Sequence, residues 1–308
     1  MFILGDVHGN IRFLDDYVFP LADGLGVDAI VQLGDYGYWE HEPSGVLFND
    51  AVMDACARYS IPFYFLRGNH DKLSHLLATY GDNVTEGGFI QIRPRLFYIP
   101  DGHTWTWDGC SFRAFGGAYS VDKQYRLQQE NKRRIARWAK EHARRDAGRP
   151  PKEVVDPAGE LWFPEEQLTD EQWKALLGAE EPGHVDVLLS HDKPRSANHP
   201  ELRLKDLIDC WPNQHWLQRA IRLHTPKLHL HGHLHHRYTA SVRSGDDLWT
   251  TVFGLACDWD AAPKFVRPHD AWALLDIDVA GVPLQITPGN HPSLQVPKLV
   301  DFEGTDDL

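Results

Sequence analysis

Five short clusters of Asp, Asn and His, spread from residue 6 to residue 235, carry the side chains best suited to chemistry in this chain. They read GDVHGN at 5–10, LGD at 33–35, RGNHD at 67–71, LLSHD at 188–192 and GHLH at 232–235. Each cluster follows a short apolar run. Mixed oxygen and nitrogen donors suit divalent metals such as Mn, Fe, Zn, Co and Ni. The donors are too many for one tetrahedral ion and predict a site for two.

Short apolar strands and amphipathic helices alternate at the start of the chain. Residues 2–4, 29–31 and 62–66 have the composition of buried strands, and 10–23 and 46–59 have the apolar spacing of helices. This order predicts a β-α-β-α-β unit with a parallel sheet. The first three clusters would then lie together, because ligands bind beyond the carboxyl ends of parallel strands.

The chain becomes richer in strands after residue 87. Asp108-Gly109 predicts a hairpin turn between two of these strands. Further strands are expected at 89–92, 96–99, 105–107, 112–115, 185–189, 228–230, 239–242, 249–253 and 271–277. The expected fold class is α/β, with two mixed β-sheets packed face to face as a sandwich and flanked by helices.

The predicted organisation is one domain over residues 1–280 with a helical insertion at 119–182. A Pro- and Gly-rich tail is expected at 281–308. The insertion concentrates basic residues between 123 and 149, where ten Lys and Arg side chains accompany three acidic ones. This segment is either a solvated helix or an arm that meets phosphates near the cleft.

Composition narrows the class of protein. The chain has 308 residues and a formal net charge of −13, which argues against a general nucleic-acid coat protein or a membrane-surface binder. Its four cysteines have no CxxC spacing and indicate reduced residues of a cytoplasmic protein. No apolar run approaches membrane-spanning length, and Met1 leads directly into the first strand without a signal peptide.

The five clusters match in order the pattern D-x-H, G-D, G-N-H-[DE], H and G-H-x-H. In this respect residues 5–235 resemble the calcineurin-like metallophosphoesterase superfamily. The resemblance implies two divalent ions, manganese first, with iron, zinc, nickel, cobalt or magnesium as alternatives. It also implies in-line attack on a phosphate ester by a metal-bridging hydroxide.

The resemblance also implies a role for each residue of the site. One ion would be held by Asp6, His8 and His235, the other by Asn69, His191 and His233, with Asp35 as the bridge and His70 as the catalytic residue beside the leaving group. His70 would act there as general acid or transition-state donor.

The spacing within the clusters is compatible with these roles. Residues separated by one position point to the same side of an extended backbone, which applies to Asp6 with His8 and to His233 with His235. His229, His231 and His236 are expected to be structural or to support the ligands. If residues 229–235 stay extended, His231 shares a face with His233 and His235 and would be the first candidate for an additional ligand. Asp71 and Asp192 are expected to orient imidazoles as hydrogen-bond acceptors.

The segment around the bridging carboxylate departs from the protein Ser/Thr phosphatases. Those enzymes carry GDxVDRG, whereas residues 34–40 read GDYGYWE, so the Asp partner of the catalytic His and a phosphate-binding Arg are missing. The aromatic side chains of Tyr36, Tyr38, Trp39 and His41 are either core residues or a stacking surface. Residues 116–126, GGAYSVDKQYR, with WFPEE at 162–166, resemble a subgroup common in phages and actinobacteria.

The expected function is hydrolysis of a small-molecule or nucleotide-like phosphate ester. One alternative is a nuclease or polynucleotide end-processing phosphatase that uses segment 123–149 to contact nucleic acid. Another is an inactive scaffold with the same fold. Retention of His70 and of the full expected ligand set argues against the scaffold.

Overall fold

Two mixed β-sheets packed face to face form the centre of the molecule. The computed structural model describes residues 1–178, 183–198, 204–261, 267–277, 285–289 and 291. The first sheet has the strand order β13-β12-β1-β2-β3-β5-β4 and the second β10-β11-β9-β8-β7-β6. The strands are β1 (Phe2–Leu4), β2 (Ile30–Gln32), β3 (Phe63–Phe65), β4 (Ile90–Arg93), β5 (Leu96–Tyr98), β6 (Thr104–Trp107), β7 (Cys110–Phe115), β8 (Val187–Ser190), β9 (Leu228–His231), β10 (Tyr238–Arg243), β11 (Trp249–Gly254), β12 (Trp272–Asp276) and β13 (Gln285–Pro288).

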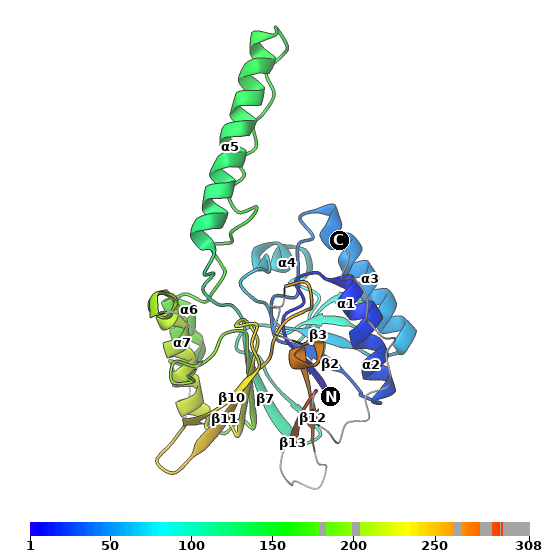
Figure 1. Ribbon diagram of the computed structural model, residues 1–308, viewed down its shortest axis with the longest axis vertical. Coiled ribbons are helices and arrows are strands. Elements are labelled where there is room, and N and C mark those ends of the chain that lie inside the picture. Colours follow the sequence, from blue (N-terminus) through cyan, green and yellow to red (C-terminus); the bar gives the residue numbers. More distant parts are fainter. Residues whose placement is uncertain (179–182, 199–203, 262–266, 278–284, 290, 292–308) are drawn as a thin grey trace.

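Helices cover the outer face of each sheet, as Figure 1 shows. The first sheet is covered by α1 (Ile11–Phe13), the π-helical turn η1 (Leu14–Val18), α2 (Phe19–Gly24), α3 (Pro43–Tyr59) and α4 (Leu73–Tyr80). The second sheet is covered by α6 (Asp170–Leu177) and α7 (Leu204–His224). A short 3-10 turn, η2 (Pro268–Ala271), precedes β12.

Alternation along the strands explains the four layers. Ile3 and Val31 pack into the apolar core between the sheets, together with residues of the second sheet such as Val187. Phe2 and Leu4 point the opposite way and pack against the helices of the first sheet. Successive side chains of a strand face opposite sides of a sheet. Each short strand therefore contributes apolar side chains both to the core between the sheets and to the core beneath the helices. The predicted α/β sandwich flanked by helices is confirmed.

The parallel strands bring the polar clusters to one edge of the sandwich. Strands β1, β2, β3 and β5 pair in parallel in the first sheet, and β7, β8, β9 and β11 in the second. The loops after β1, β2, β3, β8 and β9 carry the five clusters. All these loops follow the carboxyl ends of parallel strands, which lie at the same edge of the sandwich. The loops therefore converge there although they are far apart in the sequence.

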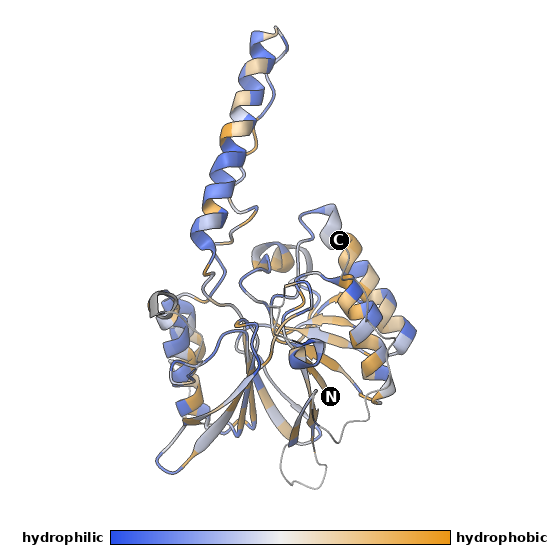
Figure 2. Ribbon diagram, in the orientation of Figure 1, coloured by the Kyte–Doolittle hydropathy of each residue, from blue (hydrophilic) through white to orange (hydrophobic). Residues whose placement is uncertain are grey.

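Helix α5 (Lys123–Asp146) rises from the sandwich as a long arm, and the chain returns alongside it (Figure 1). The arm is mostly hydrophilic with a few apolar patches (Figure 2). Its first residue follows Asp122, and its base lies near the edge where the clusters converge. The base of the arm is thus placed to affect the site, while its far end is remote from it.

Three elements depart from the sequence-based expectations. Helices α4 and α7 were not predicted, and Gln285–Pro288 forms a strand antiparallel to β12 within the segment expected to be a loose tail. The rest of that segment apart from Gly289 and His291, namely 281–284, 290 and 292–308, lies outside the described residues. Within the part of the chain that is described, no helix combines the length and apolar character needed to cross a bilayer.

Candidate metal centre

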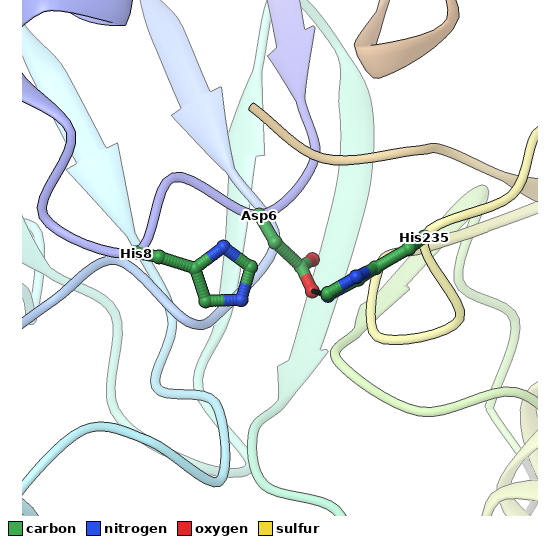
Figure 3. A group of neighbouring side chains, drawn as sticks. All are labelled: Asp6, His8 and His235. Carbon is green, nitrogen blue, oxygen red and sulfur yellow. Dashed lines mark ion pairs between the residues drawn. The ribbon is translucent and has the colours of Figure 1, made fainter. Parts of the chain in front are cut away.

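Asp6, His8 and His235 form one group of candidate ligands, shown in Figure 3. The carboxylate of Asp6 is fully buried, and its Oδ2 lies 3.2 Å from Nε2 of His235. One donor atom from each of the three residues lies within 4.8 Å of the others. The group therefore offers one oxygen and two nitrogens to a single ion, a mixture that suits Mn, Fe, Co, Ni or Zn.

The carboxylate of Asp35 lies between this group and the remaining candidates. Its Oδ2 is 3.5 Å from Nε2 of His8, and its Oδ1 is 3.4 Å from Nε2 of His191. Asp6, Asp35 and His191 also form a compact group of candidate ligands. Each of the two oxygens of this buried carboxylate thus lies next to a different imidazole.

Asn69 and His233 complete the set around His191. Nε2 of His191 lies 3.0 Å from Oδ1 of Asn69, and the rings of His191 and His233 have centroids 4.9 Å apart. Nδ1 of His191 lies 2.8 Å from the carbonyl oxygen of Leu33, so it donates there and leaves Nε2 free to bind a cation. The structure therefore brings all the expected ligands together, while their individual roles stay predictions.

The backbone at these positions is not extended, contrary to the sequence-based expectation. His8, Asp35, His233 and His235 have φ angles of 50°, 52°, 68° and 55°. This left-handed region is uncommon for residues other than glycine, and it costs about 1–3 kcal/mol per residue. Asp6 and His8 do meet, but through a turn that follows β1. Such strain is concentrated at functional sites because the surrounding structure must hold it.

Two glycines allow the loops to approach one another. A Cβ atom on Gly34, where φ is +96°, would lie 2.3 Å from Nδ1 of His191. A Cβ atom on Gly68 would lie 2.0 Å from Oδ1 of Asp35. Any side chain here would displace a candidate ligand, which gives these glycines a packing role.

The buried carboxylates make the centre attractive to positive charge. Burial alone would lower the pKa of His191, but the neighbouring Asp35 carboxylate outweighs it and raises that pKa to about 9. Burial likewise opposes the shift at His8, yet hydrogen bonds to Asp258 and Asp35 raise its pKa well above the ordinary value. Negative charge that stabilises imidazolium ions would equally stabilise bound cations. The donor set therefore fits divalent metals.

The chain matches the model of the calcineurin-like phosphoesterase family over residues 1–237. The protein belongs to this family. A comparison with curated proteins found no match. The family match covers all five clusters and ends just after His235. It does not reach Asp258, which also contacts the centre.

His70 lies at the edge of the centre, beside Asp35 and an adjacent cavity. Its Nε2 lies 3.7 Å from Oδ2 of Asp35, and its backbone N–H donates to Oδ1 of the same carboxylate at 2.8 Å. Burial, with the Arg126 guanidinium acting in the same direction, lowers the pKa of His70 to about 4 although Asp35 opposes the shift. The side chains of Asn69 and His70 diverge, so the first faces His191 and the second faces a cavity.

Three further residues contact the centre and were missed from the sequence. Oδ2 of Asp258 lies 2.9 Å from Nδ1 of His8, and Asn69 donates a hydrogen bond to Oγ of Ser120 at 3.0 Å. Arg126 donates to His70. Asp258 follows strand β11 as the other clusters follow their strands, so the same signal was available for it. Ser120 and Arg126 both lie in the segment 116–126 that resembles the phage and actinobacterial subgroup, and that likeness was the signal available for them.

Several secondary expectations are corrected by the contacts. Asp71 accepts hydrogen bonds from the backbone N–H groups of residues 36–38 and of Gly68, and Asp192 accepts from the amides of Asn213 and Gln214. Neither therefore orients an imidazole through these bonds. His231 is not a stray ligand, because its ring nitrogens lie 2.8 Å from Gly232 O and from Tyr238 Oη.

The aromatic cluster beside Asp35 divides between core and cavity. Tyr36 and Tyr38 are fully buried in the core of the first sheet. Trp39 and His41 instead line a cavity next to His70. The sequence could not show which of these rings are buried and which line the cavity, because the direction of each ring depends on the path of the folded loop.

Proposed function

We propose that this family member is a dinuclear metal-dependent phosphoesterase acting on a small-molecule or nucleotide-like phosphate ester. The observation that carries the proposal is the position of Asp35. Its two carboxylate oxygens face His8 and His191, which belong to the two different ligand sets expected from the family. A bridging carboxylate requires this placement, since each ion must receive an oxygen from the same side chain.

The ions themselves would be held by Asp6, His8 and His235 on one side and by Asn69, His191 and His233 on the other. Bound divalent ions would activate water and neutralise charge on the phosphoryl oxygens. We propose manganese as the first choice of metal. The neutral amide of Asn69 supports binding of an anionic substrate, because a carboxylate there would cancel more of the positive charge.

His70 and Arg126 are the groups of the chain placed to assist the leaving group. His70 lies beside Asp35 and lines the adjacent cavity, so it would donate to the leaving oxygen as general acid or hydrogen-bond donor. Arg126 places a guanidinium against His70. That positive charge would contact the phosphate, a task that an Arg of GDxVDRG performs in the protein phosphatases and that residues 34–40 do not provide.

The contacts of the arm give little support to the nucleic-acid alternative. Arg133 and Arg137 both pair with Glu160, and Arg134 pairs with Asp156 on the returning segment. These pairs neutralise much of the positive charge that would attract a phosphate backbone. Binding to oligonucleotides that weakens as the salt concentration rises would support the nucleic-acid alternative.

The test is hydrolysis of p-nitrophenyl phosphate and bis-p-nitrophenyl phosphate by purified protein loaded with Mn²⁺. We expect turnover that disappears after chelation and returns when Mn²⁺ is restored. Inert protein with full metal content would instead favour the scaffold. We also propose a reducing, cytoplasmic location, because all four cysteines are free and buried.

A further inference from the structure

A cavity of about 450 Å³ opens beside the metal centre, between the base of the inserted arm and the loop after β2. His8 and His70 form the wall nearest the metal centre. The opposite walls come from the first turns of α5 and from residues 160–163 of the returning segment. The volume lies in the usual range for sites that bind small organic molecules. An ester with its phosphate at the metal centre and its leaving group beside His70 would extend its organic part into this cavity.

Flat apolar side chains supply much of the wall. Trp39, Phe163 and Tyr125 line the cavity. The Trp39 ring is fixed, because its Nε1 donates to the carbonyl oxygen of His70 at 2.6 Å. Phe163 is almost fully buried, meets His41 edge to face with ring centroids 6.0 Å apart, and has Lys72 Nζ over its ring. It therefore supports the wall from behind, and Trp39 and Tyr125 are the aromatic rings that a ligand could stack on. Rigid aromatic walls favour a planar ligand, since a stacked ring keeps contact over its whole face.

Polar groups without partners also line the cavity. Both ring nitrogens of His41 are enclosed and have no hydrogen-bond partner among the described residues. Burial, reinforced by the nearby Lys72, lowers the pKa of His41, so its ring is neutral and offers one donor and one acceptor. Gln129 on α5 adds an amide with both functions. The Gln129 amide would pair with a ligand that carries ring donors and acceptors, whereas a hydrocarbon ring would leave it unpaired. The His41 nitrogens are covered in this structure and would pair with a ligand only after the ring turns toward the cavity.

The charges around the cavity disfavour a second anionic group. The carboxylates of Glu42, Asp122 and Glu160 line it, and of the described lining residues Arg126 is the one cation. Glu160 is paired with Arg133 and Arg137, which do not line the cavity, so Glu42 is the carboxylate that contributes most of the negative charge away from Arg126. Arg126 lies at the end next to His70, where its Nε also donates to Asp122 at 2.6 Å. Positive charge is thus confined to the phosphate end, and the rest of the wall is neutral or acidic.

From these walls we infer that the cavity binds an uncharged heteroaromatic group of the ester, such as a nucleobase, and that the inserted arm thereby sets substrate specificity. The orientation of the ester rests on the proposed function, because it assumes the phosphate at the metal centre. A polyphosphate chain or an acidic peptide does not fit this wall. In this proposal the base of the arm selects the substrate, and the basic residues farther along α5 take no part in the selection.

The experiment compares adenosine 5′-monophosphate with ribose 5-phosphate, which share the leaving oxygen and differ in the base. With Mn²⁺-loaded protein we expect kcat/KM for the nucleotide to be about tenfold higher, the effect of one stacked base. Gln129→Ala should lower this ratio about fivefold by removing a hydrogen-bonding group. Its matched control is Gln128→Ala, which makes the same change on an exposed neighbour that does not line the cavity.

Equilibrium dialysis of adenosine against metal-free protein provides a second readout. Adenosine should bind, Gln129→Ala should weaken binding, and ribose, which lacks the base, should bind less tightly than adenosine. Equal kcat/KM for the two esters, equal effects of the two Gln variants, or equal binding of ribose and adenosine would each overturn the inference. If neither ester is hydrolysed but adenosine binds as expected, the proposed function fails while the cavity assignment stands.

Discussion

The guanidinium of Arg126 donates a hydrogen bond to the imidazole of His70, although the two residues are 56 positions apart and lie on different elements. Nη2 of Arg126 makes its closest contact with Nδ1 of His70 and lies 3.1 Å from Nε2 of the same ring. Arg126 is held from behind by Asp122 and by the carbonyl oxygen of Leu161. The inserted arm therefore reaches the part of the site where a leaving group would sit.

Arg126→Gln should lower kcat/KM for p-nitrophenyl phosphate about 10- to 100-fold, because a charged donor to the phosphate is lost. Metal content should not change, since Arg126 cannot bind a cation. The control is Arg144→Gln, which alters a residue at the far end of α5 that pairs with Glu141. Unchanged kinetics for Arg126→Gln would remove the guanidinium from substrate binding.

His70→Asn should keep the bound metal and lower kcat about 10²- to 10⁴-fold, the usual contribution of a positioned proton donor. Steady-state kinetics with elemental analysis of the same sample separates catalysis from metal binding. His142→Asn, an exposed substitution on α5, serves as the control. Normal turnover in His70→Asn would rule out a catalytic role.

Asp35→Asn should reduce the content of both metal ions, because its carboxylate faces both ligand sets. His235→Gln should affect only the ion held with Asp6 and His8, and should leave about half of the metal by elemental analysis, since removing one ligand of a site acts mainly on that site. Circular dichroism would check that both variants fold. Full metal content in Asp35→Asn would argue against a bridge.

Asp258→Asn should weaken metal binding about 10- to 100-fold, because the carboxylate orients His8 through Nδ1. Titration of metal-free protein with Mn²⁺ measures this directly. Asp260→Asn is the matched control, since Asp260 accepts from Asn10 and not from His8. Equal affinities in the two variants would show that His8 needs no such support.

Asp186→Asn tests how much the Asp186 carboxylate on the second sheet contributes to the free energy of unfolding, and how that contribution changes with pH. Burial opposes ionisation of Asp186, but hydrogen bonds from Ser111 and Lys227 prevail and lower its pKa well below the ordinary value. Because the folded pKa lies below the unfolded one, the stabilisation is complete above the unfolded pKa and is lost as pH falls toward the folded pKa.

Asp186→Asn should therefore cost about 1–3 kcal/mol of unfolding free energy at pH 7, and the difference from wild type should shrink below about pH 4. Urea unfolding at both pH values measures it. A difference that grows in acid would contradict the assigned ionisation.

Local patterns were sufficient to predict most of the strands and, over the first sheet, the helical segments 10–23 and 46–59, whereas α4 was missed. Alternating apolar runs ending in Gly or Asp mark β1, β2 and β3, because a short buried strand must stop where polar residues begin. Strand β13 was not found, since its four residues lie in a segment whose composition indicates a tail and they gain their hydrogen bonds only from β12. Helix α7 was also overlooked.

The sequence by itself determined the ligand types and their order, because residue chemistry and strand ends can be read locally. Only the tertiary structure decided that left-handed turns, not extended backbone, aim His8 and His235 at Asp6. It also decided that Asp258 orients His8 and that Arg126 reaches His70. These contacts join residues from separate elements, so their distances depend on how the sheets and the inserted helix pack, which no local pattern specifies.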